Sequence, residues 1–299
     1  MATAFLGASD ATLDKAVFSV IPAPSEAGAT YLTGQKNAPQ AIIDASAHLE
    51  SFDEEFGRDL LALDAIYTVD PASAPSDSAL SNWLVEQVNA ALTAVAVPVV
   101  LGGDGTVSYP AIKAIADRAR DERQELSILH IDAHADLNEL DAGENNLNVM
   151  RSVLALKTKN IHLAELGVRS LSRAAFDLIS DDENGVDCFF TSDLRNASDE
   201  HWQDDVVKEL SSPVYVSIDL SALATGLVPN VGNPEPGGFT WLQLTGLLRR
   251  LATRRRIAGI DIVELCPNPN LPTSDYTVAR LVYKLMNAIV AGGKVLAKS

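Results

Sequence analysis

Three side chains of the kinds that bind metal ions stand at alternating positions in one short stretch: Asp132, His134 and Asp136. They follow residues 126–131, a largely apolar run that predicts a buried strand. Because alternate residues of an extended chain point the same way, all three side chains are expected on one face. Two carboxylates and an imidazole suit Mn²⁺, Fe²⁺, Co²⁺ or Zn²⁺ better than Ca²⁺ or a thiolate-bound metal. The simpler alternative is a polar strand end, in which Asp132 and Asp136 cap a following helix.

Acidic residues also close two other predicted strands. Asp219 follows the apolar run 214–218, and Asp261 and Glu264 lie at the end of the run 257–263. Any one of them could be a helix cap or a solvated loop residue. In an open parallel sheet, however, ligands gather outside the carboxyl ends of the strands. The three acidic segments are therefore predicted to converge at one edge of a sheet.

The elements that would position these residues alternate along the chain. Apolar runs predict strands at 16–21, 60–69, 97–101, 126–131, 161–166, 187–190, 214–218 and 257–263. Helical spacing or helix-start residues predict helices from Pro39, at 78–94, from about Pro110, and at 174–179, 200–210, 242–253 and 276–291. Neither an internal repeat nor a low-complexity linker interrupts this order. The pattern predicts a single α/β domain over residues 1–299, built around a mostly parallel sheet.

Composition narrows the classes of partner. The chain has 299 residues, 47% of them hydrophobic, and a formal net charge of −17, which argues against nucleic acid or an anionic membrane surface. No apolar run is long enough for a membrane span. The first ten residues carry no basic side chain and no long apolar core, so no signal peptide is expected. Cys188 and Cys266 lack metal-type spacing, and together these features predict a reduced, cytoplasmic protein.

The stretch 132–136 resembles the central signature of the arginase/agmatinase (ureohydrolase) family. Other family motifs are matched along nearly the whole chain, by Gly102-Gly103-Asp104, Ser217-Ile218-Asp219, Pro236-Gly237-Gly238-Phe239-Thr240 and Asp261-Ile262-Val263-Glu264, with weaker matches at Gly167-Val168-Arg169-Ser170 and Pro39-Gln40-Ala41-Ile42. The motif spacing and the stretch 40–52 are more similar to the agmatinase branch than to arginase itself. The resemblance implies an arginase-like, three-layer α/β/α fold.

The same resemblance implies a metal-dependent hydrolase, usually with two Mn²⁺ ions, acting in polyamine metabolism. In that chemistry a metal-bound hydroxide attacks the carbon of a small cationic guanidine or amidine compound, which releases urea and an amine. By motif match, Asp132 and Asp219 would bridge the metals, Asp136 would complete one site and His134 the other. Asp136 and Glu264 would be the catalytic residues, with Glu264 pairing with the guanidinium. A homo-oligomer, trimer or hexamer, is also implied.

Two expected ligands are replaced. Gly105 stands where the family has a histidine after Gly-Gly-Asp, and Ser221 stands where it has the second aspartate of Ser-x-Asp-x-Asp. Each metal site loses one protein ligand, so one weakly bound Mn²⁺, or two with added waters, are both expected outcomes. The loop that often carries a family histidine holds Asn146 and Asn148, which could orient a substrate but not shuttle a proton.

Three hypotheses follow. The first is an agmatinase-like hydrolase with an altered metal centre. The second is a non-catalytic family member, acting as a regulatory or structural subunit or a binder of a cationic ligand. The third, amide or phosphate-ester cleavage at one metal, lacks a basic phosphate-binding loop. Retention of Asp132, Asp136 and Asp219 favours a bound cation, because like charges left together would cost stability. His130, inside an apolar strand, is interpreted as a satisfied core residue.

Overall fold

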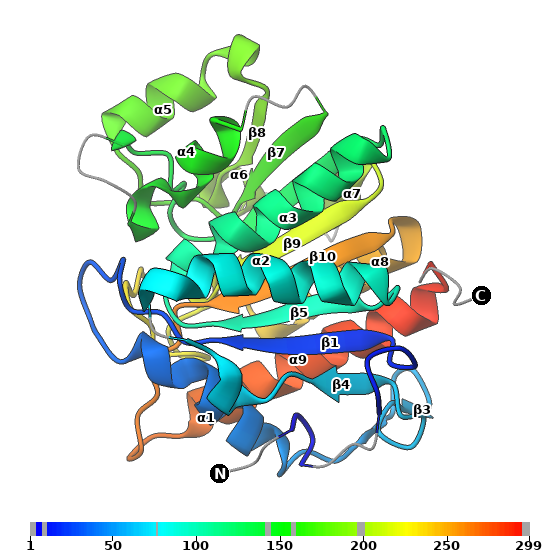
Figure 1. The fold of residues 1–299 in the computed structure, drawn as a ribbon. Helices are drawn as coiled ribbons and strands as arrows, with labels where there is room; N and C mark the ends of the chain where they lie inside the picture. The colour runs from blue at the N-terminus through cyan, green and yellow to red at the C-terminus, as the bar shows by residue number, and fades with distance from the viewer. Residues whose placement is uncertain are drawn as a thin grey trace.

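The computed structural model describes residues 4–7, 11–75, 77–140, 145–156, 160–195 and 201–294. One sheet of eight parallel strands runs through this part of the chain, in the order β4-β1-β5-β10-β9-β6-β7-β8 (Figure 1). The strands are β1 (Phe18–Ala23), β4 (Ile66–Thr68), β5 (Val97–Gly102), β6 (Leu126–Ile131), β7 (Ile161–Leu166), β8 (Val186–Phe189), β9 (Val214–Asp219) and β10 (Ile257–Val263). A separate antiparallel pair joins β2 (Phe52–Asp53) to β3 (Arg58–Asp59).

Helices cover both faces of this sheet. The apolar cluster on one face includes side chains from α1 (Ala38–Ser46), α7 (His201–Glu209), α8 (Trp241–Arg254) and α9 (Thr273–Gly292). The cluster on the other includes side chains from α2 (Asp77–Thr93), α3 (Ser108–Asp121), α4 (Val149–Leu154) and α5 (Arg173–Ile179). A short helix, α6 (Thr191–Arg195), follows β8. The expected three-layer α/β/α fold with a mostly parallel sheet is thus confirmed.

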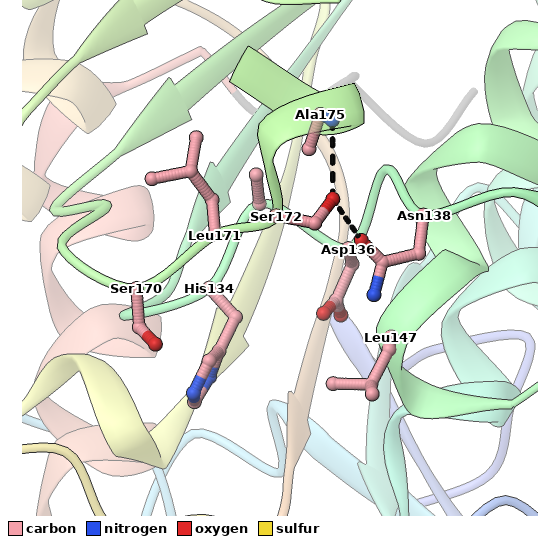
Figure 2. A pocket seen from close by; sticks show the side chains of 9 residues that line it. His134, Asp136, Asn138, Leu147, Ser170, Leu171, Ser172 and Ala175 are labelled. Atoms are coloured by element: carbon pink, nitrogen blue, oxygen red, sulfur yellow. Dashed lines mark hydrogen bonds between the residues drawn. The ribbon is translucent and has the colours of Figure 1, made fainter.

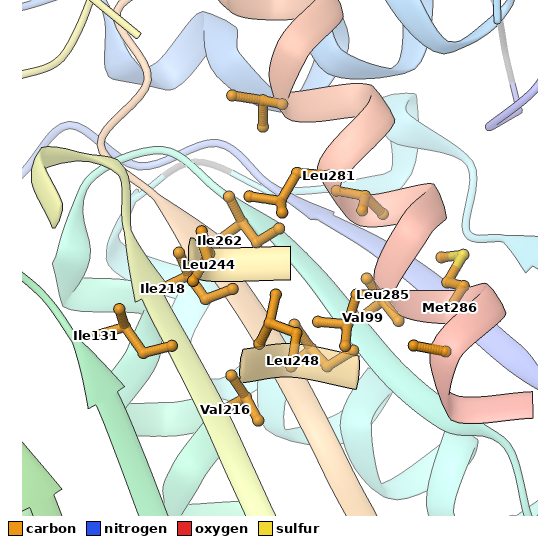
Figure 3. Close-up of a cluster of buried hydrophobic side chains, with 14 of the residues drawn as sticks. Val99, Ile131, Val216, Ile218, Leu244, Leu248, Ile262, Leu281, Leu285 and Met286 are labelled. Carbon is orange, nitrogen blue, oxygen red and sulfur yellow. The ribbon is translucent and has the colours of Figure 1, made fainter. Parts of the chain in front are cut away.

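The central strands are apolar on both faces because both are covered. Val99 and Leu101 belong to the first cluster and the intervening Val100 to the second, as the two-residue period of a strand requires. Figure 3 shows the first cluster between the sheet and helices α8 and α9. It labels Val99, Ile131, Val216, Ile218, Leu244, Leu248, Ile262, Leu281, Leu285 and Met286. This packing fixes where each strand ends, and therefore where the polar residues after it lie.

Some element boundaries differ from the sequence expectation. The strand predicted at 60–69 is shorter in the structure and consists of β4 alone. Leu60 lies in a buried turn before it and donates its backbone N–H to the Tyr283 hydroxyl over 3.1 Å instead of to a neighbouring strand. Helix α3 begins at Ser108, close to the expected Pro110. Among the described helices, none combines the length and the apolar character needed to cross a membrane.

Candidate metal centre and substrate site

The sheet order brings four separate chain segments to one edge. Strands β5, β10, β9 and β6 are consecutive neighbours and run parallel, so their carboxyl ends lie side by side. Asp132 follows β6, Asp219 ends β9 and Glu264 follows β10. These side chains are nearly inaccessible to solvent, at 1%, 7% and 1% exposure, and Asp136 is 8% exposed. The acidic residues that end these strands therefore lie together at this edge of the sheet, as predicted.

Asp136 and Asp219 lie in an electrostatically unfavourable setting. Burial, followed by the charge of Asp132, raises the pKa of both carboxyl groups well above the ordinary value for aspartate. Glu264 adds a further negative charge near both. A group of buried acids with such pKa values either holds protons or requires a cation.

Asp132 lies between two imidazoles. His134 Nδ1 is 3.5 Å from Asp132 Oδ1, and His130 Nε2 is 3.6 Å from Asp132 Oδ2. Burial alone would raise the pKa of Asp132, but its contact with His134 and the two imidazole charges bring it below the ordinary value. Asp132 Oδ1 also accepts the backbone N–H of His134 over 3.1 Å. Asp132 is therefore the acid of this group whose ionised form its surroundings favour.

His130 contributes more to this edge than its place in an apolar strand suggested. Its Nδ1 lies 2.7 Å from Glu165 Oε2, a residue directly opposite it on β7. Burial opposes protonation, yet the negative charge of Glu165 raises the pKa of His130 to about 9. His130, Asp132 and Asp136 also form a group whose ligand atoms lie within 4.8 Å of one another. Since His130 carries a proton at neutral pH, we interpret it as an internal counter-charge for Asp132.

Ser221 connects two of the acids. Its hydroxyl donates to Asp132 Oδ1 and accepts the N–H of Ala133 over 3.4 Å, while its own N–H donates to Asp219 Oδ1 over 2.7 Å. Asp219 thereby caps the short helix η7 (Leu220–Ala222) through Oδ1, one of its two carboxylate oxygens. Ser221 takes the place of an expected carboxylate ligand and instead holds Asp132 and Asp219 by hydrogen bonds.

Glu264 is surrounded by N–H donors. Its Oε1 accepts the N–H of Gly105 over 3.0 Å and Nδ2 of Asn146 over 2.5 Å, and its Oε2 accepts Nε2 of Gln35 over 3.4 Å. Burial nevertheless raises the pKa of Glu264 to about 7. The backbone of Gly232 packs so closely that a Cβ there would lie 1.9 Å from Oε2. No sequence pattern marked Gln35, which begins the short 3₁₀ helix η1 (Gln35–Asn37), or Gly232, which lies in an irregular segment.

The two asparagines after the central motif have different roles. Asn146 contacts Glu264, whereas the side chain of Asn148 accepts the N–H of Asn145 and completes a capping box. Asn148 also donates to the carbonyl of Glu139 over 3.4 Å. Of the two residues expected to orient a substrate, only Asn146 is in direct contact with a proposed catalytic carboxylate.

Two of the acids adopt an unusual backbone conformation. Asp136 has φ of 51° and Glu264 has φ of 75°, in the left-handed region that residues with side chains rarely adopt. Such backbone strain persists only where the surrounding structure enforces it, and it concentrates at functional sites. The strain therefore agrees with the catalytic roles expected for these two residues.

A cavity of about 210 Å³ opens beside Asp136 and His134 (Figure 2). Its wall includes Leu147, Ser170 and Asn138, whose Oδ1 accepts a hydrogen bond of 2.6 Å from the Ser172 hydroxyl. The cavity is large enough for a small polar molecule, and Asp136 is the member of the acidic group that lines it.

Comparison with known proteins decides the family. Residues 16–290 match the Arginase family. The chain belongs to this family. It is 32% identical over 282 residues to an N(1)-aminopropylagmatine ureohydrolase of Thermus thermophilus, covering 93% of this chain and 92% of that protein. The corresponding Synechocystis protein is 28% identical over 276 residues, covering 89% and 87%.

Solved structures of other arginase-like proteins share the fold. Agmatine ureohydrolase of Thermoplasma volcanium superposes with a TM-score of 0.82 at 24% identity, covering 98% of this chain and 97% of that one. Proclavaminate amidino hydrolase of Streptomyces clavuligerus also gives 0.82, at 21% identity and 98% coverage of both chains. The resemblance drawn from the short motifs is therefore confirmed at the level of family and fold.

The residue types expected as ligands, three carboxylates from Asp132, Asp136 and Asp219 and an imidazole from His134, suit Mn²⁺. Among the described residues, however, the group whose ligand atoms all lie within 4.8 Å of one another is His130, Asp132 and Asp136, and it includes neither His134 nor Asp219. Asp132 Oδ2 is buried and has no hydrogen-bond partner within the described residues, so an acceptor is available at the centre of the group. Gly105 and Ser221 provide no anionic or imidazole ligand.

Proposed function

We propose that this protein is an agmatinase-like hydrolase that cleaves a linear guanidino compound to urea and an amine, with an altered Mn²⁺ centre. The observation that carries the proposal is the buried group Asp132, Asp136 and Asp219, in a member of the arginase family. Family membership makes a ureohydrolase the first expectation, and the raised pKa values of Asp136 and Asp219 favour a bound cation.

The residues would divide the work as follows. Asp132, Asp136, Asp219 and His134 would hold the metal, which when bound lowers the pKa of a water molecule and supplies the nucleophile. Ser221 would keep the Asp132 and Asp219 carboxylates in a fixed orientation. The positive charge of protonated His130 partly balances the negative charge of the Asp132 carboxylate, which weakens metal binding by Asp132 Oδ2.

Glu264 would bind the guanidinium of the substrate. A guanidinium offers several N–H donors in one plane and forms charge-assisted hydrogen bonds with a carboxylate. Because the pKa of Glu264 is about 7, the carboxylate becomes fully charged only above neutral pH. Substrate binding is therefore expected to strengthen as the pH rises through this value.

The test combines metal content with urea release. Protein purified without chelator would be analysed before and after incubation with Mn²⁺, and urea would be measured with agmatine and with N(1)-aminopropylagmatine, the substrates named for its relatives. Bound metal together with urea release supports the proposal. An Asp117→Asn variant is a matched control, because that carboxylate pairs with Lys113 and Arg120 on α3. Absence of both metal and urea, even at high Mn²⁺, would overturn the proposal.

A non-catalytic role is the second candidate, and the replaced positions Gly105 and Ser221 favour it. The decisive variant combines Gly105→His with Ser221→Asp, which returns both expected ligands, and adds Asn146→Ala, because Asn146 Oδ1 is 3.5 Å from where a Cβ at position 105 would lie. Urea release by this triple variant alone would identify the natural protein as a non-catalytic family member. Urea release by the wild type would exclude that role. A trimeric or hexameric assembly stays a prediction, to be measured by light scattering.

A further inference from the structure

The space beside Gly105 is occupied by one side chain. If Gly105 carried a Cβ, the atoms within 4 Å of it would be Oδ1 of Asn146 at 3.5 Å and Cγ of the same residue at 3.8 Å. The carboxamide of Asn146 therefore stands where a residue at position 105 would extend. The replaced ligand position and the asparagine come from segments more than forty residues apart.

The orientation of this carboxamide is set by Glu264. Nδ2 of Asn146 donates to Glu264 Oε1, and rotating the amide by half a turn would bring two oxygen acceptors together. Oδ1 of Asn146 is consequently directed away from Glu264. It is buried, the residue being 4% exposed, and has no hydrogen-bond partner among the described residues. A buried acceptor without a partner is unfavourable, so a bound group is expected to contact it.

The surroundings hold the side chain firmly. The N–H of Asn146 donates to the carbonyl of Gly28 over 3.3 Å, and the N–H of Gly28 donates to Asp104 Oδ2 over 2.6 Å. A Cβ on Gly28 would lie 3.0 Å from Asn146 Oδ1, so two glycine backbones leave the room that the carboxamide takes. The capping box of Asn145 and Asn148 braces the same turn.

We propose that Asn146 supplies, through Oδ1, the oxygen donor that position 105 lacks, and thereby completes the coordination of a divalent cation held by Asp132, Asp136 and Asp219. Carboxamide oxygens are accepted ligands of hard cations, and Mn²⁺ tolerates mixed carboxylate and carbonyl ligands. The inference rests on the proposed metal-dependent function. It also gives Asn146 two tasks, because its Nδ2 positions Glu264 at the same time.

The experiment is a calorimetric titration with Mn²⁺ alone, in wild type and four variants. Asn146→Ala removes the oxygen and is expected to weaken Mn²⁺ binding about tenfold or more. Asn146→Asp adds charge to the oxygen, so tighter Mn²⁺ binding is expected. It also replaces the Nδ2 donor by an oxygen, so the titration is run below about pH 7, where Glu264 holds a proton that can donate to the new carboxylate. Asn148→Asp is the matched control: it adds the same charge two residues away while keeping the acceptor that binds the N–H of Asn145.

Gly105→His combined with Asn146→Ala completes the set of variants. Removing the carboxamide frees the space beside position 105, so the imidazole is expected to recover the Mn²⁺ affinity that Asn146→Ala loses. Thermal unfolding without metal checks that each variant is folded. If Asn146→Ala does not fold, the Mn²⁺ affinities of Asn146→Asp and Asn148→Asp still test whether Asn146 is a ligand.

The outcomes separate the two proposals. If wild type binds Mn²⁺ and Asn146→Ala binds it equally well, the role of Asn146 is overturned while the metal centre stands. Equal tightening by Asn146→Asp and Asn148→Asp would also overturn it, because the gain would then reflect general charge. If wild type binds no Mn²⁺, both proposals fail. Weaker binding in Asn146→Ala, with tightening specific to Asn146→Asp, supports the inference.

Discussion

Two groups of buried carboxylates lie at the same edge of the sheet, and the protein treats them differently. Glu264 accepts three N–H donors from Gly105, Asn146 and Gln35. Asp136 is surrounded by the charges of other acids, including Asp132 and Asp219. Burial is almost equal in the two places, so the difference arises from the supply of donors. The chain preorganises Glu264 by itself, whereas Asp136 and Asp219 need a proton or a cation.

This difference predicts which substitutions weaken metal binding and which weaken substrate binding. Removing a charge from the aspartate group alters the cation site itself. Removing the charge of Glu264 leaves the aspartates as they are and alters a pocket whose donors are already in place. Variants at the two positions should therefore separate metal binding from turnover.

The largest effect is expected for Asp132→Asn. This change removes the charge at the centre of the proposed ligand group, so metal-derived stabilisation of several kcal/mol is lost and urea release should fall roughly 10³-fold or more. Mn²⁺ binding, measured by calorimetry, should weaken in parallel. Full activity with unchanged Mn²⁺ affinity would contradict the assignment of Asp132 as a ligand.

Glu165→Gln is expected to destabilise the fold. It removes the nearer of the two carboxylates beside the buried imidazolium of His130 and leaves Asp132 at 3.6 Å, and breaking a buried pair costs about 3–5 kcal/mol. The free energy of unfolding, measured by urea denaturation without metal, should decrease accordingly. The pKa of His130 should fall as well, which NMR titration of the imidazole would detect. A pKa that stays near 9 would show that Glu165 is not its cause.

The stability of the metal-free protein should decrease as the pH rises. An acid whose pKa is higher in the folded chain binds its proton more tightly there, so the folded state gains stability at low pH and loses it through the folded pKa. For Glu264 that window runs from its ordinary pKa of 4.5 to about 7, and is worth roughly 3 kcal/mol. His130 extends the decline to about pH 9, because its pKa is also raised.

Thermal unfolding in chelator between about pH 5 and about pH 9 tests this slope. Saturating Mn²⁺ should flatten it, since the cation would replace protons on the aspartate group. A midpoint that rises with pH in the metal-free protein would contradict the raised pKa values.

Glu264→Gln should reduce turnover and leave the metal in place. The lost charge-assisted hydrogen bonds are worth about 1.5–3 kcal/mol, which corresponds to a decrease of roughly 10- to 150-fold in kcat/KM. Mn²⁺ affinity should change far less than in Asp132→Asn. Equal loss of metal binding in both variants would remove the distinction between the two groups.

The sequence predicted the residues that end strands better than those that come from loops. Asp132, Asp219 and Glu264 follow apolar runs, and the topology rule for parallel sheets brings such residues to one edge. Strand order is what makes them neighbours, and the structure supplies it: β10, β9 and β6 are consecutive in the sheet. Asn146 and Asn148 were indistinguishable in sequence, because their difference depends on how one short 3₁₀ turn is capped.

His130 and Gln35 show what a single sequence leaves out. His130 was correctly interpreted as a satisfied residue, but its partner Glu165 lies on another strand, and only the register of β6 with β7 brings the two together. Gln35 begins a three-residue 3₁₀ helix after Gly34, which is too short for a periodic pattern to mark it as buried. Long-range pairings of this kind arise from packing, and composition or spacing does not encode them locally.

The smallest effect is expected for Asp187→Asn, at the opposite edge of the sheet. His162 Nε2 lies 2.7 Å from Asp187 Oδ2, the same separation as in the pair of His130 and Glu165. Here, however, the side chains are 31% and 48% exposed, against 3% and 0% for the buried pair. Water screens the exposed pair, so its loss should cost less than about 1 kcal/mol and leave Mn²⁺ binding unchanged. Urea denaturation beside Glu165→Gln gives the comparison at matched geometry. Equal destabilisation of the two variants would mean that burial does not determine how much these pairs contribute to the free energy of unfolding.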